Sequence, residues 1–354
     1  MLPSGAILPR MKFDIDPDTE RFIRNLPKTE THLHIEGALP LEFLQQVAGT
    51  RYPSAPASWD QSYRFDSFAD FEHDLLAMAG HWYTSPKRYQ EAAAKIFDGL
   101  IYRQNVHYVE TSFASGMMEA HDMDAREVAE SIRAAAPKGL HLRIFLGIHH
   151  DGYHKGTQKW IDDCLAGDAI DGIDLHGTET MPLGDWAVDL WRRAREAGKA
   201  TKAHSGEFCG PEFVRRVVNE LGVRRVQHGV RAIEDPDTVS LLVDKDVTLD
   251  VCPISNVKLG VVPSYSDHPI GRLMDAGVRC TVSTDDPISF GNTLLDEYTM
   301  LAGACGFDKR RLAKVARAGF EVAMISESER AGWLSDFDRI VEDSLGRETS
   351  LRKV

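Results

Sequence analysis

The sequence predicts an α/β fold in which parallel strands alternate with helices. Short runs rich in β-branched and apolar residues are separated by segments of helical periodicity, which is typical of βα units. Most of these runs are almost continuously apolar, as expected of strands that are covered on both faces. The predicted strands are residues 29–35, 106–113, 141–149, 169–176, 199–204, 225–230, 247–252 and 278–283. Eight strands in this alternation indicate a (β/α)8 TIM barrel, with an open doubly wound sheet as the alternative.

One connection is far longer than a βα loop requires. About residues 36–105 separate the first two predicted strands, and within them Phe68, Phe71, Leu75, Met78 and Trp82 recur at helical spacing. This pattern is compatible with a helix packed on the barrel. The functional interpretation is a helical lid, with some of these side chains walling a flat apolar ligand. We therefore expect one barrel domain over 1–354, with the lid inserted after the first strand, helices after the last strand, and a frayed tail over about 344–354.

Composition and charge exclude several classes of protein. The chain has 354 residues, 43% of them apolar, and its 41 Lys and Arg against 54 Asp and Glu give a net charge of −13. Nucleic-acid and membrane-surface binders need a basic face, so neither kind of partner is expected. The N-terminal residues 1–20 lack the features of a signal peptide. The five cysteines are widely spaced without a CxxC pair, which indicates a reduced, cytoplasmic compartment.

Candidate metal ligands follow several of the predicted strands. His32 and His34 lie two residues apart near the end of the first strand, so their side chains point to the same side. In a barrel, the carboxyl ends of all strands meet at the rim where active sites form. The same rim receives further titratable residues from three other strands, namely His204, Glu207, His228, Asp285 and Asp286. Several imidazoles and a carboxylate bind a divalent ion, most often zinc, with Fe²⁺ or Mn²⁺ as alternatives. The fourth strand offers no lysine that could bridge two ions, so we expect one metal ion per chain.

These motifs resemble the adenosine/adenine deaminase family of the amidohydrolase superfamily. The resemblance rests on Thr-His32-Leu-His34-Ile-Glu36-Gly37, Ala-His204-Ser-Gly-Glu207, Gln-His228-Gly-Val, Cys-Pro-Ile-Ser255-Asn256 and Ser-Thr-Asp285-Asp286-Pro, which occur in the family's order. It implies a TIM barrel that removes ammonia from C6 of a 6-aminopurine by hydrolysis.

The resemblance also implies a role for each matching residue. Zinc would be bound by His32, His34, His204 and Asp285. Glu207 would protonate purine N1, and His228 would orient the zinc-bound water, help to deprotonate it and stabilise the attack. Asp286 would hydrogen-bond the attacking hydroxide and purine N7. Gly177 would donate its N–H to N3.

The substrate is less narrowly defined than the chemistry. Glu36 occupies a position near the ribose where adenosine deaminases usually have Asp, and it resembles the adenine-type members. The segment after Asp286 resembles the adenosine-type members instead. We expect an adenosine-like nucleoside as the substrate, with free adenine or aminodeoxyfutalosine as alternatives. Two more distant hypotheses are an enzyme that hydrolyses amides or lactams and a non-catalytic purine sensor.

Overall fold

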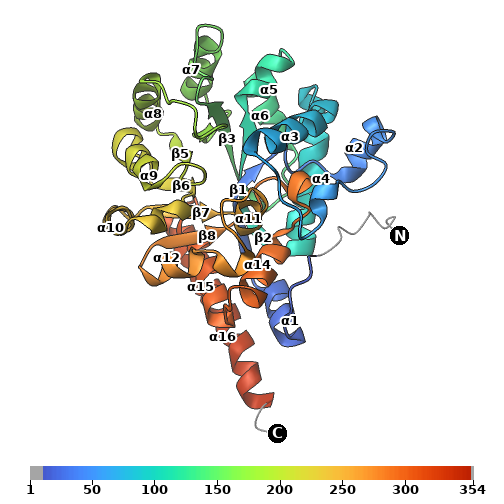
Figure 1. Ribbon diagram of the computed structural model, residues 1–354, viewed down its shortest axis with the longest axis vertical. Coiled ribbons are helices and arrows are strands. Elements are labelled where there is room, and N and C mark those ends of the chain that lie inside the picture. The colour runs from blue at the N-terminus through green and yellow to red at the C-terminus, as the bar shows by residue number, and fades with distance from the viewer. Residues whose placement is uncertain (1–10, 352–354) are drawn as a thin grey trace.

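The computed structural model describes residues 11–351 and consists of a ring of parallel strands surrounded by helices (Figure 1). The eight strands follow one another in the order β1-β2-β3-β4-β5-β6-β7-β8, and each neighbouring pair is parallel. An isolated bridge between Leu33 and Asp285 brings β1 to the end of β8. The (β/α)8 barrel predicted from the sequence is confirmed, and the open doubly wound sheet is not observed.

All eight predicted strands are present, with their ends shifted by up to three residues. They are β1 (Lys28–His34), β2 (Val106–Ala114), β3 (His141–His149), β4 (Gly172–His176), β5 (Ala200–Ser205), β6 (Arg225–His228), β7 (Thr248–Val251) and β8 (Arg279–Val282). β6 ends before the predicted 230 because Gly229, at φ 68°, turns into the left-handed region and starts the helical turn η3.

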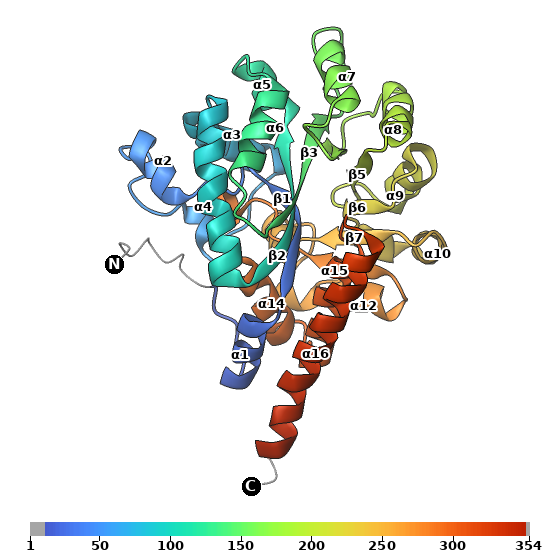
Figure 2. The same ribbon diagram turned by 180° about the vertical axis from the view of Figure 1, so that it is seen from behind.

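The helices form the outer layer of the barrel, as Figure 2 shows from behind. Those up to β4 are α1 (Pro17–Asn25), α2 (Leu41–Ala48), η1 (Ala57–Trp59), α3 (Phe68–Trp82), α4 (Pro86–Gln104), α5 (Ser115–Ala120), α6 (Ala125–Ala134) and α7 (Gln158–Ala166). Those between β4 and β8 are α8 (Trp186–Glu196), α9 (Pro211–Arg216), η2 (Val217–Leu221), η3 (Val230–Glu234), α10 (Pro236–Asp244), α11 (Pro253–Lys258), η4 (Tyr265–Asp267) and α12 (Ile270–Asp275). The last are α13 (Pro287–Phe290), α14 (Leu294–Gly303), α15 (Lys309–Glu321) and α16 (Glu327–Leu351).

The long connection after β1 contains α2, η1, α3 and α4. The side chain of Ser67 caps α3 by accepting a hydrogen bond from Asp70 N, and Ser85 caps α4 in the same way. Phe71 stacks on Phe290 of α13, with ring centroids 5.3 Å apart, so this connection packs against the loop that follows β8.

Both ends of the chain extend beyond the described residues. Residues 1–10, which form half of the N-terminal segment without signal-peptide features, lie outside them, as do 352–354. α16 is helical as far as Leu351, within the tail that is predicted to fray. Among the described helices, none has the length and apolar character needed to cross a membrane.

The interior of the barrel is charged at its amino-terminal end. Arg225 donates to Asp250 at 2.7 and 3.0 Å and to Glu110 at 3.1 and 3.2 Å. The ammonium of Lys202 also pairs with Glu110 and donates to Thr31 O at 2.7 Å. Two buried cations therefore match two buried carboxylates. This charged layer replaces the branched apolar side chains that usually fill such barrels.

Candidate active site

The carboxyl ends of the strands bring the predicted site residues together around one cavity of about 90 Å³. Its polar lining includes all the predicted site residues except His32, namely His34, Glu36, Gly177, His204, Glu207, His228, Asp285 and Asp286. The buried His32 side chain does not line the cavity, but its Nε2 atom lies 3.1 Å from His204 Nε2. The structure therefore brings the residues predicted from the sequence together at one place on the barrel.

Three imidazole nitrogens converge at the base of this cavity. His34 Nε2 lies 3.2 Å from both His32 Nε2 and His204 Nε2. The Oδ1 atom of Asp285 is 3.1 Å from His34 Nε2 and 3.4 Å from His32 Nε2. Four potential ligand atoms thus come from β1, β5 and the end of β8.

The second ring nitrogens of His32 and His204 show which tautomer each of these two imidazoles adopts. His32 Nδ1 faces Asp250 O at 3.2 Å, and His204 Nδ1 faces Leu175 O at 2.8 Å. A carbonyl oxygen only accepts, so each Nδ1 carries the hydrogen and each Nε2 presents its lone pair. Converging lone pairs beside a carboxylate repel one another unless a cation lies between them. The arrangement fits a divalent metal, and backbone carbonyls that orient ligand histidines are typical of such sites.

His228 has the opposite hydrogen-bonding arrangement. Distance alone would group it with His32, His204 and Asp285, because the ligand atoms of these four residues lie within 4.8 Å of one another. However, the amide nitrogen of Asn256 lies 3.1 Å from His228 Nδ1, and its amide oxygen faces His268 Nε2 at 3.3 Å. His228 Nδ1 therefore accepts, and its Nε2 carries the hydrogen. That N–H faces Glu207 Oε1 at 3.5 Å and Asp285 Oδ2 at 3.9 Å.

Strained backbone turns the side chains of two site residues. His228 and Asp285 have φ values of 60° and 66°, in the left-handed region that residues other than glycine rarely adopt. Each such conformation costs about 1–3 kcal/mol and persists only where the surrounding structure imposes it. Asp285 is held by backbone hydrogen bonds to β1, since its N–H donates to His32 O and its carbonyl accepts from His34 N.

Two further carboxyl groups lie in the cavity with unused hydrogen-bonding capacity. Glu207 Oε1 and Asp286 Oδ1 are buried and have no hydrogen-bond partner. Burial, together with the nearby Asp285 carboxylate, raises the pKa of Glu207 well above its usual range. Burial likewise raises the pKa of Asp286. Groups with these properties are suited to proton transfer or to hydrogen-bonding a ligand.

Glycine at position 37 lets Asp286 approach β1. A Cβ atom on Gly37 would lie 1.7 Å from Asp286 Oδ1, which no pair of atoms can tolerate. The backbone of the same glycine also fixes the loop after β8, because Ile288 N donates to Gly37 O at 2.7 Å. Gly37 therefore belongs to the site although it carries no reactive group.

Glu36 lies at the edge of the cavity and is already hydrogen-bonded. Its Oε1 atom accepts from the hydroxyl of Tyr89 at 2.7 Å and from Ala114 N at 3.0 Å. Tyr89 belongs to α4, so the long connection after β1 reaches the cavity through this hydrogen bond. Burial raises the pKa of the Glu36 carboxyl.

The apolar wall of the cavity comes from α3. Phe68, Phe71 and Leu75, three of the residues that recur at helical spacing, line the cavity together with Leu76 and Ala79. Met78 and Trp82 from the same series are buried in the core instead. A lid role for this connection remains a prediction.

Sequence reasoning did not identify several residues that support this site. Ser255 donates to Asp285 Oδ2 at 2.7 Å, and Asn256 sets the tautomer of His228. The sequence indicates both only as parts of a motif and predicts neither role. Glu179 accepts hydrogen bonds from backbone N–H groups of the loop after β5. Nothing in the sequence around Glu179 signals this contact, because its partners are backbone atoms of a loop on another strand.

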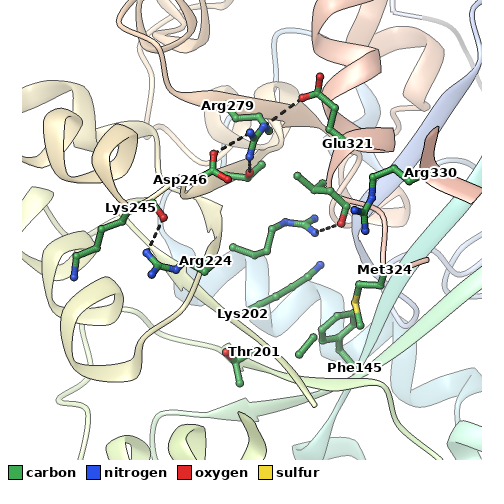
Figure 3. A pocket seen from close by; sticks show the side chains of 14 residues that line it. Phe145, Thr201, Lys202, Arg224, Lys245, Asp246, Arg279, Glu321, Met324 and Arg330 are labelled. Carbon is green, nitrogen blue, oxygen red and sulfur yellow. Dashed lines mark hydrogen bonds and ion pairs between the residues drawn. The ribbon is translucent and has the colours of Figure 1, made fainter. Parts of the chain in front are cut away.

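A larger cavity of about 540 Å³ lies at the opposite end of the barrel (Figure 3). It is lined by the first residues of β5 to β8 and by the end of α15, among them Lys202, Arg225, Arg279 and Glu321. Arg279 pairs with Asp246 at 2.8 Å and with Glu321 at 3.3 Å, as the dashed lines in Figure 3 show. None of the predicted site residues lines this cavity.

Comparisons with known proteins agree with the fold and the motifs. The adenine deaminase of Streptomyces coelicolor is 31% identical over 330 residues, and the alignment covers 88% of this chain and 95% of the relative. The adenine deaminase of Sphingopyxis alaskensis is 32% identical over 327 residues, covering 90% of this chain and 95% of the relative. Among solved structures, adenine deaminase from Arthrobacter aurescens superimposes with a TM-score of 0.79 at 23% identity, covering 90% of this chain and 99% of that one. An amidohydrolase from Burkholderia ambifaria with bound Zn has a TM-score of 0.82 at 20% identity, with 95% and 97% coverage. The N6-methyl-AMP deaminase of Arabidopsis thaliana has a TM-score of 0.74 at 19% identity, with 90% and 98% coverage.

The adenosine deaminase family as a whole matches residues 27–340. This range contains all eight strands and every residue that lines the rim cavity. The chain therefore belongs to the adenosine deaminase family.

Proposed function

We propose that this protein is a metal-dependent hydrolase that deaminates free adenine to hypoxanthine and ammonia. One observation carries the proposal: converging imidazole lone pairs lie beside two buried carboxyl groups, Glu207 and Asp286, whose unpartnered oxygens face one small cavity. Such a site can hold a metal ion, a water molecule and a heterocycle with several ring nitrogens. The broader assignment, a deaminase of aminopurines, agrees with the names of the relatives that are 31% and 32% identical, both of which are adenine deaminases.

Free adenine is better supported than the nucleoside expected from the sequence. Both of these relatives are adenine deaminases. The cavity of about 90 Å³ is well below the ~300–1,000 Å³ typical of pockets for larger ligands. Glu36 occupies the position at which Glu is typical of the adenine-type members, and the hydroxyl of Tyr89 holds its side chain in the cavity. These observations together favour the free base, the alternative named from the sequence.

A nucleotide substrate is disfavoured by charge. The described residues that line the cavity include five carboxyl groups, from Glu36, Glu72, Glu207, Asp285 and Asp286, but no lysine or arginine. Phosphate recognition normally uses Arg or Lys, and a phosphate dianion would be repelled by these carboxylates.

The proposed metal is one zinc ion held by His32, His34, His204 and Asp285. When bound, the ion lowers the pKa of a water molecule toward neutrality and supplies the nucleophile at neutral pH. The tautomers described above present the ligand nitrogens of His32 and His204 in the form a metal requires. Ser255 holds the other oxygen of Asp285 and so orients that carboxylate.

The remaining side chains move protons and orient the purine. His228 presents an N–H beside Glu207 and Asp285, where it can orient the attacking water and stabilise charge that develops on its oxygen. Glu207, whose pKa is raised by burial, gives a proton to N1 as the new C6–O bond forms. Asp286 accepts a hydrogen bond from the water or from the ring, and the N–H of Gly177 serves N3. The C6–N6 bond then breaks, and the amino group leaves as ammonia after it takes up a proton that came from water.

The proposal is tested by the specificity constant for ammonia release. We would measure kcat/KM with zinc-loaded enzyme on adenine, adenosine, aminodeoxyfutalosine and AMP in parallel. Adenine is expected to reach at least ~10⁴ M⁻¹s⁻¹ and to exceed the other three by at least about 100-fold. A higher value for adenosine would replace the free base by the nucleoside. Ring-opened products without ammonia would favour the amide-hydrolysing alternative. A metal content near zero in carefully prepared protein, with purine binding retained, would favour the sensor.

The proposed setting is the cytoplasm. The cysteine pattern of the sequence is the support for it, since the cysteines are few, odd in number and widely spaced. All five have free thiols in the structure.

A further inference from the structure

The carboxylate of Glu179 is buried beneath the loop that carries Glu207. Glu179 lies three residues after β4, and its side chain accepts hydrogen bonds from the four consecutive N–H groups of residues 206–209. The N–O distances run from 2.5 to 3.1 Å. Consecutive N–H groups that point to one spot form an anion-binding concavity, and here the anion is a side chain of the same protein.

The same loop is held on its other side by the exit of β6. Gly229 N donates to Ser205 O at 3.0 Å, and Arg231 N donates to Gly206 O at 2.9 Å. Gly206 has a φ of 72°, and a Cβ atom there would lie 2.5 Å from Val214, so this turn requires glycine. The carbonyl groups of the loop are thus fixed by one neighbouring segment and its N–H groups by Glu179.

Glu179 itself does not line the rim cavity, whereas Gly177, two residues earlier on the same loop, does. The Glu179 hydrogen bonds therefore connect the loop that presents the Gly177 backbone with the loop that presents the Glu207 side chain. Under the proposed function these two groups serve N3 and N1 of one purine ring.

We propose that Glu179 is a positioning residue for catalysis: it fixes the backbone of Glu207 relative to Gly177, so that both meet the same purine ring. This inference rests on the proposed function, because it assigns Glu207 the transfer of a proton to the ring. Glu179 acts through the loop and does not touch the substrate.

The physical reason is the number of buried donors that depend on this one side chain. Removing the carboxylate leaves four N–H groups without their acceptor, and each unsatisfied buried group is destabilising unless the loop moves. The loop is therefore expected to rearrange, and a displacement of about 1 Å of a catalytic group can cost ~10²-fold in rate. Burial raises the pKa of the Glu179 carboxyl, while the four N–H donors act in the opposite direction by stabilising its charged form.

Steady-state kinetics of Glu179→Ala and Glu179→Gln test this role. Glu179→Ala should lower kcat for adenine about 100-fold with KM changed less than about threefold, and zinc content should stay at the wild-type level. Glu179→Gln should lose less, about 10-fold, because its amide oxygen can still accept from part of the loop. The matched control is Glu212→Ala, which removes an exposed carboxylate that, among the described residues, accepts only from Gly210 N at the end of the same loop. It should leave kcat within about twofold.

A double-mutant cycle with Glu207→Gln separates positioning from a general structural effect. If Glu179 acts through Glu207, the double variant Glu179→Ala/Glu207→Gln should have the kcat of Glu207→Gln alone, within about twofold. Multiplication of the two losses would overturn the proposal, as would an unchanged kcat in Glu179→Ala.

Hydrogen–deuterium exchange of residues 206–209 provides a readout that does not require activity. These amides should exchange at least about 10-fold faster in Glu179→Ala than in wild type and should be unchanged in Glu212→Ala. If wild-type enzyme fails to deaminate adenine, the proposed function is wrong, and the exchange rates still decide whether Glu179 holds this loop. If wild-type enzyme is active, unchanged exchange of these amides in Glu179→Ala would refute the Glu179 inference alone.

Discussion

The two ends of the barrel both bury charged side chains, but they differ in how completely those charges are partnered. At the amino-terminal end, Arg225 bridges Glu110 and Asp250, and Lys202 adds a second cation. Asp250 also accepts from the hydroxyls of Thr31 and Thr281. At the carboxyl-terminal rim, Glu207 and Asp286 keep oxygens without hydrogen-bond partners, and the Nε2 lone pairs of His32 and His204 converge 3.1 Å apart.

This difference indicates which of the two clusters is suited to catalysis. A buried polar group normally finds a partner, so an unpartnered group needs an explanation such as a missing ion or substrate. The amino-terminal cluster needs no such explanation, since its cations and carboxylates pair with one another inside the barrel. Under the proposed function, the smaller cavity lies at the reactive end of the barrel and the larger one at the opposite end.

The sharpest test of this contrast removes a proposed ligand at the rim. Asp285→Ala should lower kcat/KM by at least ~10³-fold and lower bound zinc to the same extent, because a metal site with one ligand fewer binds weakly. Metal analysis by plasma mass spectrometry and ammonia release measure both. Asp246→Ala, which removes a carboxylate from the amino-terminal cavity, is the control and should retain metal and activity. Full zinc occupancy in Asp285→Ala would remove Asp285 from the ligand set.

A second rim variant separates proton transfer from metal binding. Glu207→Gln should lower kcat by about 10²–10⁴-fold, the usual contribution of general acid catalysis, while zinc content and thermal stability stay unchanged. The variant keeps the size of the side chain but has no acidic proton to give. Near wild-type turnover would show that Glu207 is not the proton donor.

At the amino-terminal end, the expected effect is on stability. Arg225→Met leaves Glu110 and Asp250 without their main cation and should lower the free energy of unfolding by about 3–5 kcal/mol. Urea denaturation measures this loss, and kcat/KM of the folded enzyme should stay within about threefold. The neighbouring Arg224, whose side chain donates to the Lys245 carbonyl, is the control; Arg224→Met should change stability by no more than about 0.5 kcal/mol. A large loss of kcat with intact stability in Arg225→Met would contradict the division between the two ends.

The smallest effect is expected at the edge of the rim cavity. Glu36→Asp shortens the carboxylate that Tyr89 and Ala114 hold. The added space should shift the ratio of kcat/KM for adenine over adenosine toward the nucleoside by about 10-fold. An unchanged ratio would remove Glu36 as a determinant of specificity.

Much of the fold and the position of the site followed from the sequence. Continuous apolar runs indicated all eight strands, since strands covered on both faces leave that local pattern. The His32 and His34 pair pointed to the rim because residues two apart on a strand share a side. Strand ends were less well predicted, as at β6, where the turn at Gly229 ends the strand before its apolar pattern does.

What the sequence could not supply depends on contacts between distant segments. His228 differs from the proposed ligand histidines in the partner of its Nδ1 atom. That partner is the side-chain amide nitrogen of Asn256 on α11, a segment distant in the sequence. The Glu179 contact joins a side chain after β4 to backbone N–H groups after β5. The preference for the base over the nucleoside rests partly on a cavity whose volume is set by α3 and the loop after β8.

The close approach of Asp286 to Gly37 has a practical use for sorting uncharacterised sequences. Because any Cβ at position 37 would collide with the Asp286 carboxylate, a barrel that keeps its histidines but replaces this glycine cannot place that aspartate in the same way. Such a chain could still retain a metal site while having lost, or changed, the chemistry performed there. A search of genome sequences for members of this family that keep this arrangement should therefore require the glycine together with the histidine pair.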